Sequence, residues 1–312
     1  MTTVRSHGLA RRRVAAWTLA FSVMLLGGCG GGGSSGSLPL VVPPAPPAPT
    51  AQINGSNYLD AAAVGSVGRG RALELAGLLD FSFTLGVSSN FTTANFNCPS
   101  GGTVTLTVAS VSSNTTAPNN CNLGVALLKS GSIQVSNLEV VVSGTPPRTD
   151  LSRGTYRVLD FVTRVLPGDG VDQAYNASVQ ANRQADASVS LSGSFTVLRS
   201  SRTDSYSTLT LSIARPGGQF TSTGATFDIA TPRFAIQPLR TVADESATRV
   251  LRVSAPDGSN VKVTTVSAAS GSTPAQLRFE VFANATTTTP SVTQTLAEND
   301  PQVVAAINRA LQ

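Results

Sequence analysis

Apolar residues alternate with polar ones along most of this chain. In one such run, Leu191, Phe195 and Val197 interleave with serines and a threonine. A period of two places the apolar side chains on one face of a β-strand and the polar side chains on the other. The same alternation predicts strands near residues 81–87, 103–109, 132–142, 156–165, 175–184, 190–197, 208–213, 226–236, 248–254, 261–267 and 276–281.

Together these runs predict about eleven strands. They are separated by turn sequences such as Pro99-Ser-Gly-Gly, Pro167-Gly-Asp-Gly and Pro256-Asp-Gly-Ser. Most of the intervals are too short for a crossover helix, so the sheet should be antiparallel. A sheet of this size must curl, close or split in two. We therefore predict a mainly β fold with one large curved antiparallel sheet, as a partial barrel or a sandwich.

Two segments are candidates for helices that cover the apolar face of the sheet. Asp300 and Pro301 form an N-cap followed by proline at the first helical position, and Val303, Ile307 and Leu311 then share one face. The Ala-rich stretch 57–79 is the second candidate, although glycines interrupt it. The sequence predicts a C-terminal helix and leaves the N-terminal one open.

The first 28 residues have the pattern of a secretory signal. Arg11-Arg12-Arg13 precedes a short apolar segment, residues 14–26, which is shorter than the roughly 20 residues that a transmembrane helix needs. The run Leu25-Leu26-Gly27-Gly28-Cys29 resembles the lipobox of bacterial lipoprotein signal peptides. That resemblance implies cleavage before Cys29 and acylation of Cys29, which would then hold the protein on a membrane. An ordinary secreted protein cut near Gly27 is the alternative.

The resemblance also indicates a location. Position 30 is Gly rather than the Asp that retains lipoproteins in the inner membrane in enterobacteria-like sorting. We therefore expect a cell-envelope protein held on the outer membrane by lipid, on either its periplasmic or its outer face.

A linker follows the cysteine. Residues 30–37 are nearly all Gly and Ser and should form a flexible coil, and residues 39–49 are Pro-rich and should form an extended spacer of roughly 30 Å. We predict three parts: a signal peptide over 1–28, a lipidated linker over 29–52, and a single β-rich domain over 53–312.

Removing the signal restricts the available chemistry. Four of the 22 basic residues lie in residues 1–28, so 18 remain against 17 acidic residues, and the mature chain is nearly neutral. This balance argues against nucleic-acid binding. The single His and the single Trp also lie in the signal. The mature chain therefore cannot form a Ser-His-Asp site or a His-ligated metal site, and we predict no cofactor and no metal.

Cys98 and Cys121 remain as an even pair in an oxidising compartment, so we predict a disulfide between them. Around them, Cys98-Pro-Ser-Gly-Gly, a Thr/Val strand and Asn120-Cys121 resemble a pattern in β-rich lipoproteins of proteobacteria. This resemblance covers about residues 53–145. It implies no activity and transfers no site residue.

The remaining motifs are weak. Ser259 and Lys262 match Ser-x-x-Lys but lie across a turn and a strand, where positions i and i+3 face opposite ways. Asp169 and Asp172 lack the full spacing of a calcium loop. A glycosidase-like pair could come from several carboxylates that spacing does not distinguish: Asp150, Asp160, Asp186, Asp204, Asp228, Asp244, Glu245 and Glu280.

These observations favour a non-enzymatic envelope module that binds a protein partner or an apolar ligand. Two alternatives remain: an extracytoplasmic hydrolase that uses paired carboxylates, and a surface-exposed adhesion module. No catalytic residue is identified, and the membrane, through Cys29, is the one partner to which the sequence points.

The lipid anchor can be tested by substitution. We expect Cys29→Ala to abolish incorporation of an alkyne-labelled palmitate in a proteobacterial host, because the acyl chains need the thiol and the new amino terminus of that residue. The double variant Cys98→Ala/Cys121→Ala should keep the label. Equal labelling of the Cys29→Ala protein and the parent would contradict the assignment.

Overall fold

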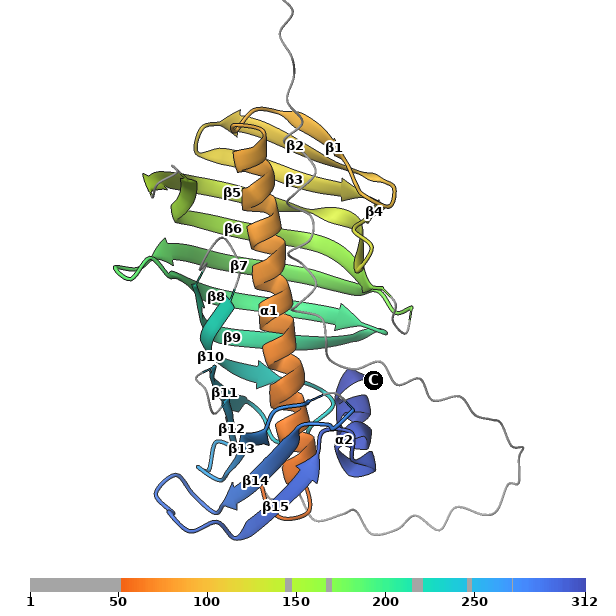
Figure 1. Ribbon diagram of the computed structural model, residues 1–312, viewed down its shortest axis with the longest axis vertical. Helices are drawn as coiled ribbons and strands as arrows, with labels where there is room; N and C mark the ends of the chain where they lie inside the picture. Colours follow the sequence, from red (N-terminus) through yellow and green to blue (C-terminus); the bar gives the residue numbers. More distant parts are fainter. Residues whose placement is uncertain (1–51, 144–147, 167–169, 215–220, 246–248, 271) are drawn as a thin grey trace, which may run out of the picture.

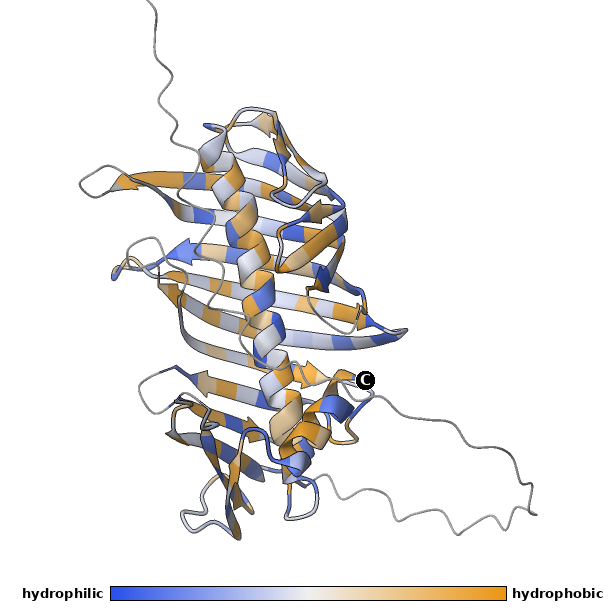
Figure 2. Cartoon of the chain, turned by 45° about the vertical axis from the view of Figure 1, so that its right-hand side comes forward, coloured by the Kyte–Doolittle hydropathy of each residue, from blue (hydrophilic) through white to orange (hydrophobic). Residues whose placement is uncertain are grey.

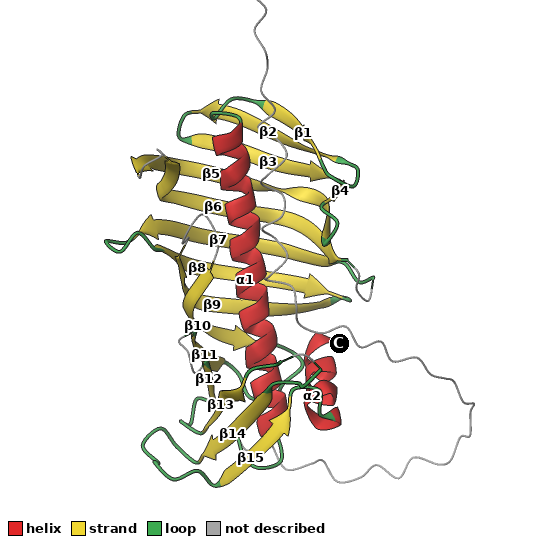
Figure 3. Cartoon of the chain, viewed as in Figure 1, coloured by secondary structure: helices red, strands yellow, loops and turns green. Residues whose placement is uncertain are grey.

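The computed structural model describes residues 52–143, 148–166, 170–214, 221–245, 249–270 and 272–312. Within these residues, two helices and fifteen strands follow one another (Figures 1 and 3). They are α1 (Tyr58–Ser88), β1 (Ala94–Asn97), β2 (Thr103–Ser110), β3 (Ser113–Asn119), β4 (Cys121–Asn122), β5 (Ala126–Ser143), β6 (Arg148–Val165), β7 (Gln173–Arg183), β8 (Val189–Arg199), β9 (Arg202–Ala214), β10 (Thr221–Ala230), β11 (Leu239–Asp244), β12 (Val250–Ser254), β13 (Asn260–Ser267), β14 (Gln276–Phe282), β15 (Val292–Ala297) and α2 (Pro301–Leu311).

The strands form one 15-stranded antiparallel sheet whose order follows the sequence from β1 to β15, except that β4 pairs only with β5. Strands β1 and β15 lie at opposite ends of this order and do not pair, so the sheet is open. The predicted large antiparallel sheet and C-terminal helix are confirmed. The predicted number of strands is too low, because polar segments such as Ser113–Asn119 and Val292–Ala297 also form strands.

The prediction of a strand at residues 81–87 is wrong, because these residues form the last turns of α1. Phe81, Phe83, Leu85 and Val87 alternate with other residues as they would in a strand. However, Phe83 also follows Leu75 and Leu79 at intervals of four, and all three side chains are buried. The helical spacing prevails because it continues the face that α1 already packs against the sheet.

Helix α1 crosses the strands along the length of the sheet (Figure 1). Its 31 residues span about 46 Å at 1.5 Å per residue. The buried face carries small residues in its first half, among them Ala61, Gly65 and Gly68, and larger ones such as Leu75 and Phe83 in its second half. The helix backbone therefore approaches strands β9–β12 closely, and longer side chains fill the space further along.

Two glycines mark the close approach. A Cβ atom at Gly65 would lie 2.3 Å from a methyl carbon of Val253, and one at Gly68 would lie 2.9 Å from the ring of Phe227. Val253 and Phe227 are completely buried, so neither side chain has space to retreat. These glycines, which weaken α1 as a helix, are needed for its packing.

The core lies between α1 and the face of the sheet that α1 covers, and the alternation seen in the sequence places it there. Tyr175, Val179 and Ala181 of β7 are buried, whereas Ser178 and Gln180 are exposed. Figure 2 shows the resulting alternation of polar and apolar positions along the strands. The apolar face that needed a cover is thus covered mainly by one helix of the same chain.

Three contacts fix the ends of this arrangement. The backbone N–H of Ile53 donates to Ser259 Oγ at 2.7 Å, which attaches the start of the described chain near β13. Arg199 donates to the carbonyl oxygen of Leu311 at the end of α2. The predicted Cys98–Cys121 disulfide is confirmed, with the two Cα atoms 5.4 Å apart.

Neither helix in the described residues combines the length and the hydropathy needed to cross a membrane.

The packing of α1 predicts opposite effects at two glycines of the same helix. We expect Gly65→Ala to lower the free energy of unfolding by about 1–3 kcal/mol, because the new methyl group overpacks against Val253. Gly70 is exposed and a Cβ there would meet nothing within 4 Å. Gly70→Ala should therefore raise stability by about 0.5–1 kcal/mol. Urea unfolding measures both, and a stabilising Gly65→Ala would contradict the close approach.

Candidate functional site

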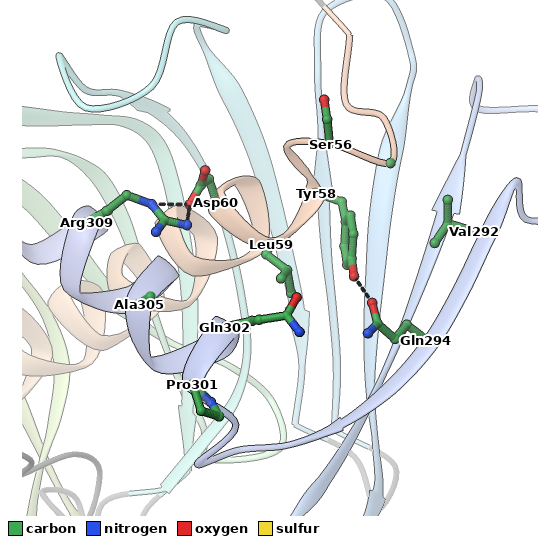
Figure 4. Close-up of a pocket in the computed structure, with 11 residues that line it drawn as sticks. Ser56, Tyr58, Leu59, Asp60, Val292, Gln294, Pro301, Gln302, Ala305 and Arg309 are labelled. Carbon is green, nitrogen blue, oxygen red and sulfur yellow. Dashed lines mark hydrogen bonds and ion pairs between the residues drawn. The ribbon is translucent and has the colours of Figure 1, made fainter.

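A cleft of about 560 Å³ lies where the start of α1, helix α2 and strand β15 meet (Figure 4). Its volume falls within the range of ligand pockets in proteins, roughly 300–1,000 Å³. Its walls combine apolar groups with hydroxyl and amide groups, from Gly55, Ser56, Tyr58, Leu59, Asp60, Val292, Gln294, Pro301, Gln302, Ala305 and Arg309. We take this cleft as the candidate site.

Helix α2 forms one wall because both its ends are held. Its N-cap is Asp300, whose carboxylate accepts the N–H of Gln302 at 2.9 Å, as the Asp-Pro sequence predicted. Near its other end, Arg309 donates to Asp60 Oδ1 of α1 from Nε at 2.9 Å and from Nη2 at 2.6 Å. The buried side chains of Val303, Ala306 and Ala310 share the inner face between these points.

Tyr58 forms the base of the cleft. Its ring packs edge-on against Phe279, with centroids 5.9 Å apart, and its hydroxyl donates to the side-chain oxygen of Gln294 (Figure 4). Burial, and to a lesser degree the nearby negative charge of Asp300, raise the pKa of Tyr58 above its ordinary value. The neutral hydroxyl donates to the oxygen of the Gln294 amide and so holds the orientation of that amide. The NH₂ group of Gln294 can then donate to a ligand in the cleft.

The cleft is equipped for binding. The Ser56 hydroxyl donates to Asn54 Oδ1 at 2.7 Å, so the serine faces an amide and not a base. Asp60 is already bonded to Arg309. The side-chain amides of Gln294 and Gln302, which both donate and accept, are the groups best placed to recognise a neutral polar ligand such as a peptide backbone.

A second polar cluster lies beneath α1, and its side chains are largely buried. Glu74 accepts hydrogen bonds from the hydroxyls of Thr163, at 3.0 Å, and Tyr175, and it pairs with Arg71 at 3.4 Å. Burial raises the pKa of Tyr175 well above its ordinary value, and the charge of Glu74 adds to this effect. The cluster attaches the middle of α1 to β6 and β7, which is a structural role.

A neighbouring buried ion pair continues this cluster. Arg233 pairs with Asp204, which also accepts from Thr231 Oγ1 at 2.6 Å. The pKa of Tyr206 is raised, mainly by burial and next by the charge of Asp204. The ring of Tyr206 stacks on Phe195 with centroids 4.2 Å apart. These polar groups are enclosed by the core.

Seven of the eight carboxylates considered in the sequence contact basic or neutral side chains. Arginine or lysine pairs with Asp150, Asp204, Asp228, Glu245 and Glu280, whereas Asp160 bonds Asn176 and Asp186 bonds Ser188. Asp244 is the last residue of β11 and lies opposite Gly224 of β10 and Val250 of β12. Asp172 pairs with Lys129 at 2.7 Å and Arg164 at 2.8 Å, and their hydrogen bonds lower its pKa. Asp169 lies outside the described residues, as does Cys29.

Ser259 and Lys262, the Ser-x-x-Lys pair of the sequence, bond to different partners. The buried Ser259 hydroxyl donates to Asp257 and accepts from Ile53, whereas Lys262 pairs with Glu280. Within the part of the chain that the structure describes, no three His, Cys, Asp or Glu side chains gather where they could hold a metal ion.

The cleft itself was not predicted from the sequence. Its walls come from residues 55–60 and 292–309, which are distant along the chain and carry no motif. The one signal was the Asp300-Pro301 cap, which located α2 but not its neighbours. No protein-family model, curated protein or solved structure matches this chain.

The buried tyrosines predict a loss of stability in alkali. Unfolded tyrosines lose a proton near pH 10, whereas Tyr175 and Tyr206 keep theirs in the fold, so above pH 10 the unfolded state binds fewer protons. Each of the two tyrosines should therefore lower the free energy of unfolding by about 1.4 kcal/mol per pH unit above pH 10.

Tyr206→Phe keeps the stacked ring and should remove one such contribution from the slope. Tyr175→Phe should remove another, and the double variant both. Urea unfolding between pH 9 and 11.5 measures these slopes. Equal slopes in all four proteins would show that the tyrosines ionise normally.

Proposed function

We propose that this protein is a lipid-anchored component of the cell envelope that binds a protein partner and catalyses no reaction. The lipobox-like sequence ending at Cys29 and the Gly/Ser and Pro-rich linker support the anchored location. The open cleft between α1, α2 and β15 is the proposed binding site. Gly55 and Ser56 line it, so a bound partner would contact residues that closely follow the linker in the sequence.

The occupation of the inner sheet face by α1 carries this proposal. A carrier of acyl chains built on a curved sheet would need an apolar cavity on that face. Between α1 and strands β6–β9 lies an apolar cavity of about 40 Å³, lined among others by Ala76, Phe83 and Leu191. That volume has room for a few water molecules at most and is far below the roughly 300–1,000 Å³ of ligand pockets. The packing therefore favours a protein partner over an apolar ligand.

The cleft favours a partner with exposed peptide groups. Its amide-bearing side chains, Gln294 and Gln302, stand among short apolar ones such as Val292 and Ala305. An extended neutral segment would bury the apolar groups and exchange hydrogen bonds with the amides. The opposite charges on the rim, Asp60 and Arg309, already neutralise one another.

An adhesion role is the second candidate, and the outer face of the sheet favours it. Gln180, Ser192, Thr210 and Thr226 are cross-strand neighbours on β7, β8, β9 and β10. This row of uncharged polar groups could contact a hydroxylated surface. Protease treatment of intact cells tests it, since a periplasmic domain would resist digestion until the outer membrane is opened.

Site-specific photocrosslinking tests the cleft. We expect p-benzoylphenylalanine at Ala305 to form a discrete protein adduct in intact cells, whereas the same group at Thr107, exposed on β2 far from the cleft, should not. Gln302→Ala should reduce the Ala305 adduct by about fivefold or more, since the loss of one or two hydrogen bonds lowers affinity on that scale.

Three outcomes would contradict the proposal. They are an adduct of equal yield from Thr107, an adduct insensitive to Gln302→Ala, and a lipid in place of a protein at Ala305. Native mass spectrometry of the purified protein provides a separate check, because a stoichiometric non-covalent lipid would restore the apolar-ligand alternative.

A further inference from the structure

Strands β5 and β6 extend beyond their neighbours. Each has 18 residues, whereas β7 has 11 and β3 has 7. The register of β3 with β5 ends at Asn114 opposite Val135, and that of β7 with β6 ends at Arg153 opposite Asn182. Beyond these points β5 and β6 still pair with one another. We name the extension, Glu139–Val142 with Thr149–Ser152, the β5–β6 tip.

The outer edge of the β5–β6 tip is open. The N–H of Leu138 donates to the carbonyl oxygen of Ser112 at 3.1 Å, and this is the last backbone contact of β5 on the β3 side. Among the described residues, no strand pairs with Glu139–Val142 on the side opposite β6. Backbone donors and acceptors along this edge can therefore receive another strand.

The same tip exposes apolar side chains. Val140 is 42% exposed and Val142 is 65% exposed, and Val111, in the turn next to Ser112, is 85% exposed. These residues lie at one corner of a sheet whose outward positions are otherwise mostly Ser, Thr, Asn and Gln, and the tip is coloured as hydrophobic in Figure 2. Valine favours strands, so Val140–Val142 combines an unpaired edge with high strand propensity.

The charges of the tip are paired within the same sheet. Natural edges carry lysine, proline or an unpaired charge that opposes the approach of a second strand. Here Glu139 accepts a hydrogen bond from Arg153 of the same hairpin, and Asp150, opposite Val141, pairs with Arg183 of β7. The three valines that follow Glu139 carry no charge.

We propose that the β5–β6 tip is a self-association surface, whose occupant is the β5–β6 tip of a second copy of this chain. An antiparallel pairing centred on Val141 places each Val140 opposite Val142 of the other copy. Valine side chains then contact valine side chains on one face of the joined sheet. The two Glu139 residues fall at opposite ends of the paired segment, so their charges do not oppose one another.

The shape of the molecule permits this pairing. Both strands lead from the tip back into the sheet on one side (Figure 1). A two-fold rotation about Val141, along an axis perpendicular to the sheet, places the second body on the other side of the tip. The two sheets then join through their β5 strands, with their α1 helices antiparallel.

Cysteine crosslinking of the full chain in intact cells tests the pairing and its register. Cys98 and Cys121 are already joined, so a new cysteine supplies a free thiol in the domain. Directly opposed residues in antiparallel strands have Cα atoms about 4.5–5.5 Å apart, which is within reach of a disulfide. We expect Val141→Cys to form a disulfide-linked dimer at least about tenfold faster than Val266→Cys, since pairing raises the effective thiol concentration.

Val266 is a stringent control, because it is a valine on β13, remote from the tip, and at 58% exposure it is more accessible than the half-buried Val141. The register predicts a second result. Val140→Cys and Val142→Cys should crosslink to each other when co-expressed, and each alone should crosslink far less. Unchanged thermal unfolding of each reduced variant confirms that it folds.

Equal dimer formation at Val141→Cys and Val266→Cys would overturn the proposal. So would a disulfide adduct with the mass of a different protein, or crosslinking of Val140→Cys alone as fast as the co-expressed pair. None of these results depends on the cleft, so the proposed function and the self-association fail or stand separately.

Discussion

The close contact between helix α1 and the inner face of the sheet is the interaction on which the rest of the structure depends. A sheet of alternating residues presents one long apolar face, and this chain buries it against a single helix that begins near β15 and ends near β1. Gly65 and Gly68 let the backbone of α1 approach the strands, and Leu75, Leu79 and Phe83 fill the wider space beyond. Since the helix occupies this face, any ligand would have to bind outside the core.

The charged groups beneath α1 make sense in this setting. A helix of small apolar residues could slide along a sheet, because apolar contacts are not directional. Glu74 of α1, bonded to Thr163 of β6 and Tyr175 of β7, is satisfied in one alignment, and displacing the helix would leave its charge unpaired in the core. We infer that these polar contacts determine where α1 lies along the sheet, while apolar burial supplies most of the stability.

The sequence reveals the parts of this fold that depend on local pattern. Alternation predicts the strands, and the Asp300-Pro301 cap predicts α2. An even pair of cysteines in a chain expected to be exported to an oxidising compartment predicts the Cys98–Cys121 disulfide. Residues 81–87 were predicted wrongly because seven residues fit both periods, and only packing on the sheet distinguishes them. The cleft could not be predicted, because Tyr58 and Gln294 meet only after the whole meander has brought β15 back to the start of α1.

The return of β15 to the start of α1 also sets the distance between the two proposed binding surfaces, the cleft and the β5–β6 tip. The cleft lies at the β15 end of the sheet and is lined by Gly55 and Ser56, which closely follow the proposed linker in the sequence. Strands β5 and β6, which form the tip, lie further along α1, past β9 and β10 as followed from the cleft (Figure 1). Because α1 is continuous and packed along its length, the distance between cleft and tip is fixed by the fold. In the functions we propose, the cleft binds a partner close to the lipid anchor while the tip contacts a second copy, and neither contact requires the core to open.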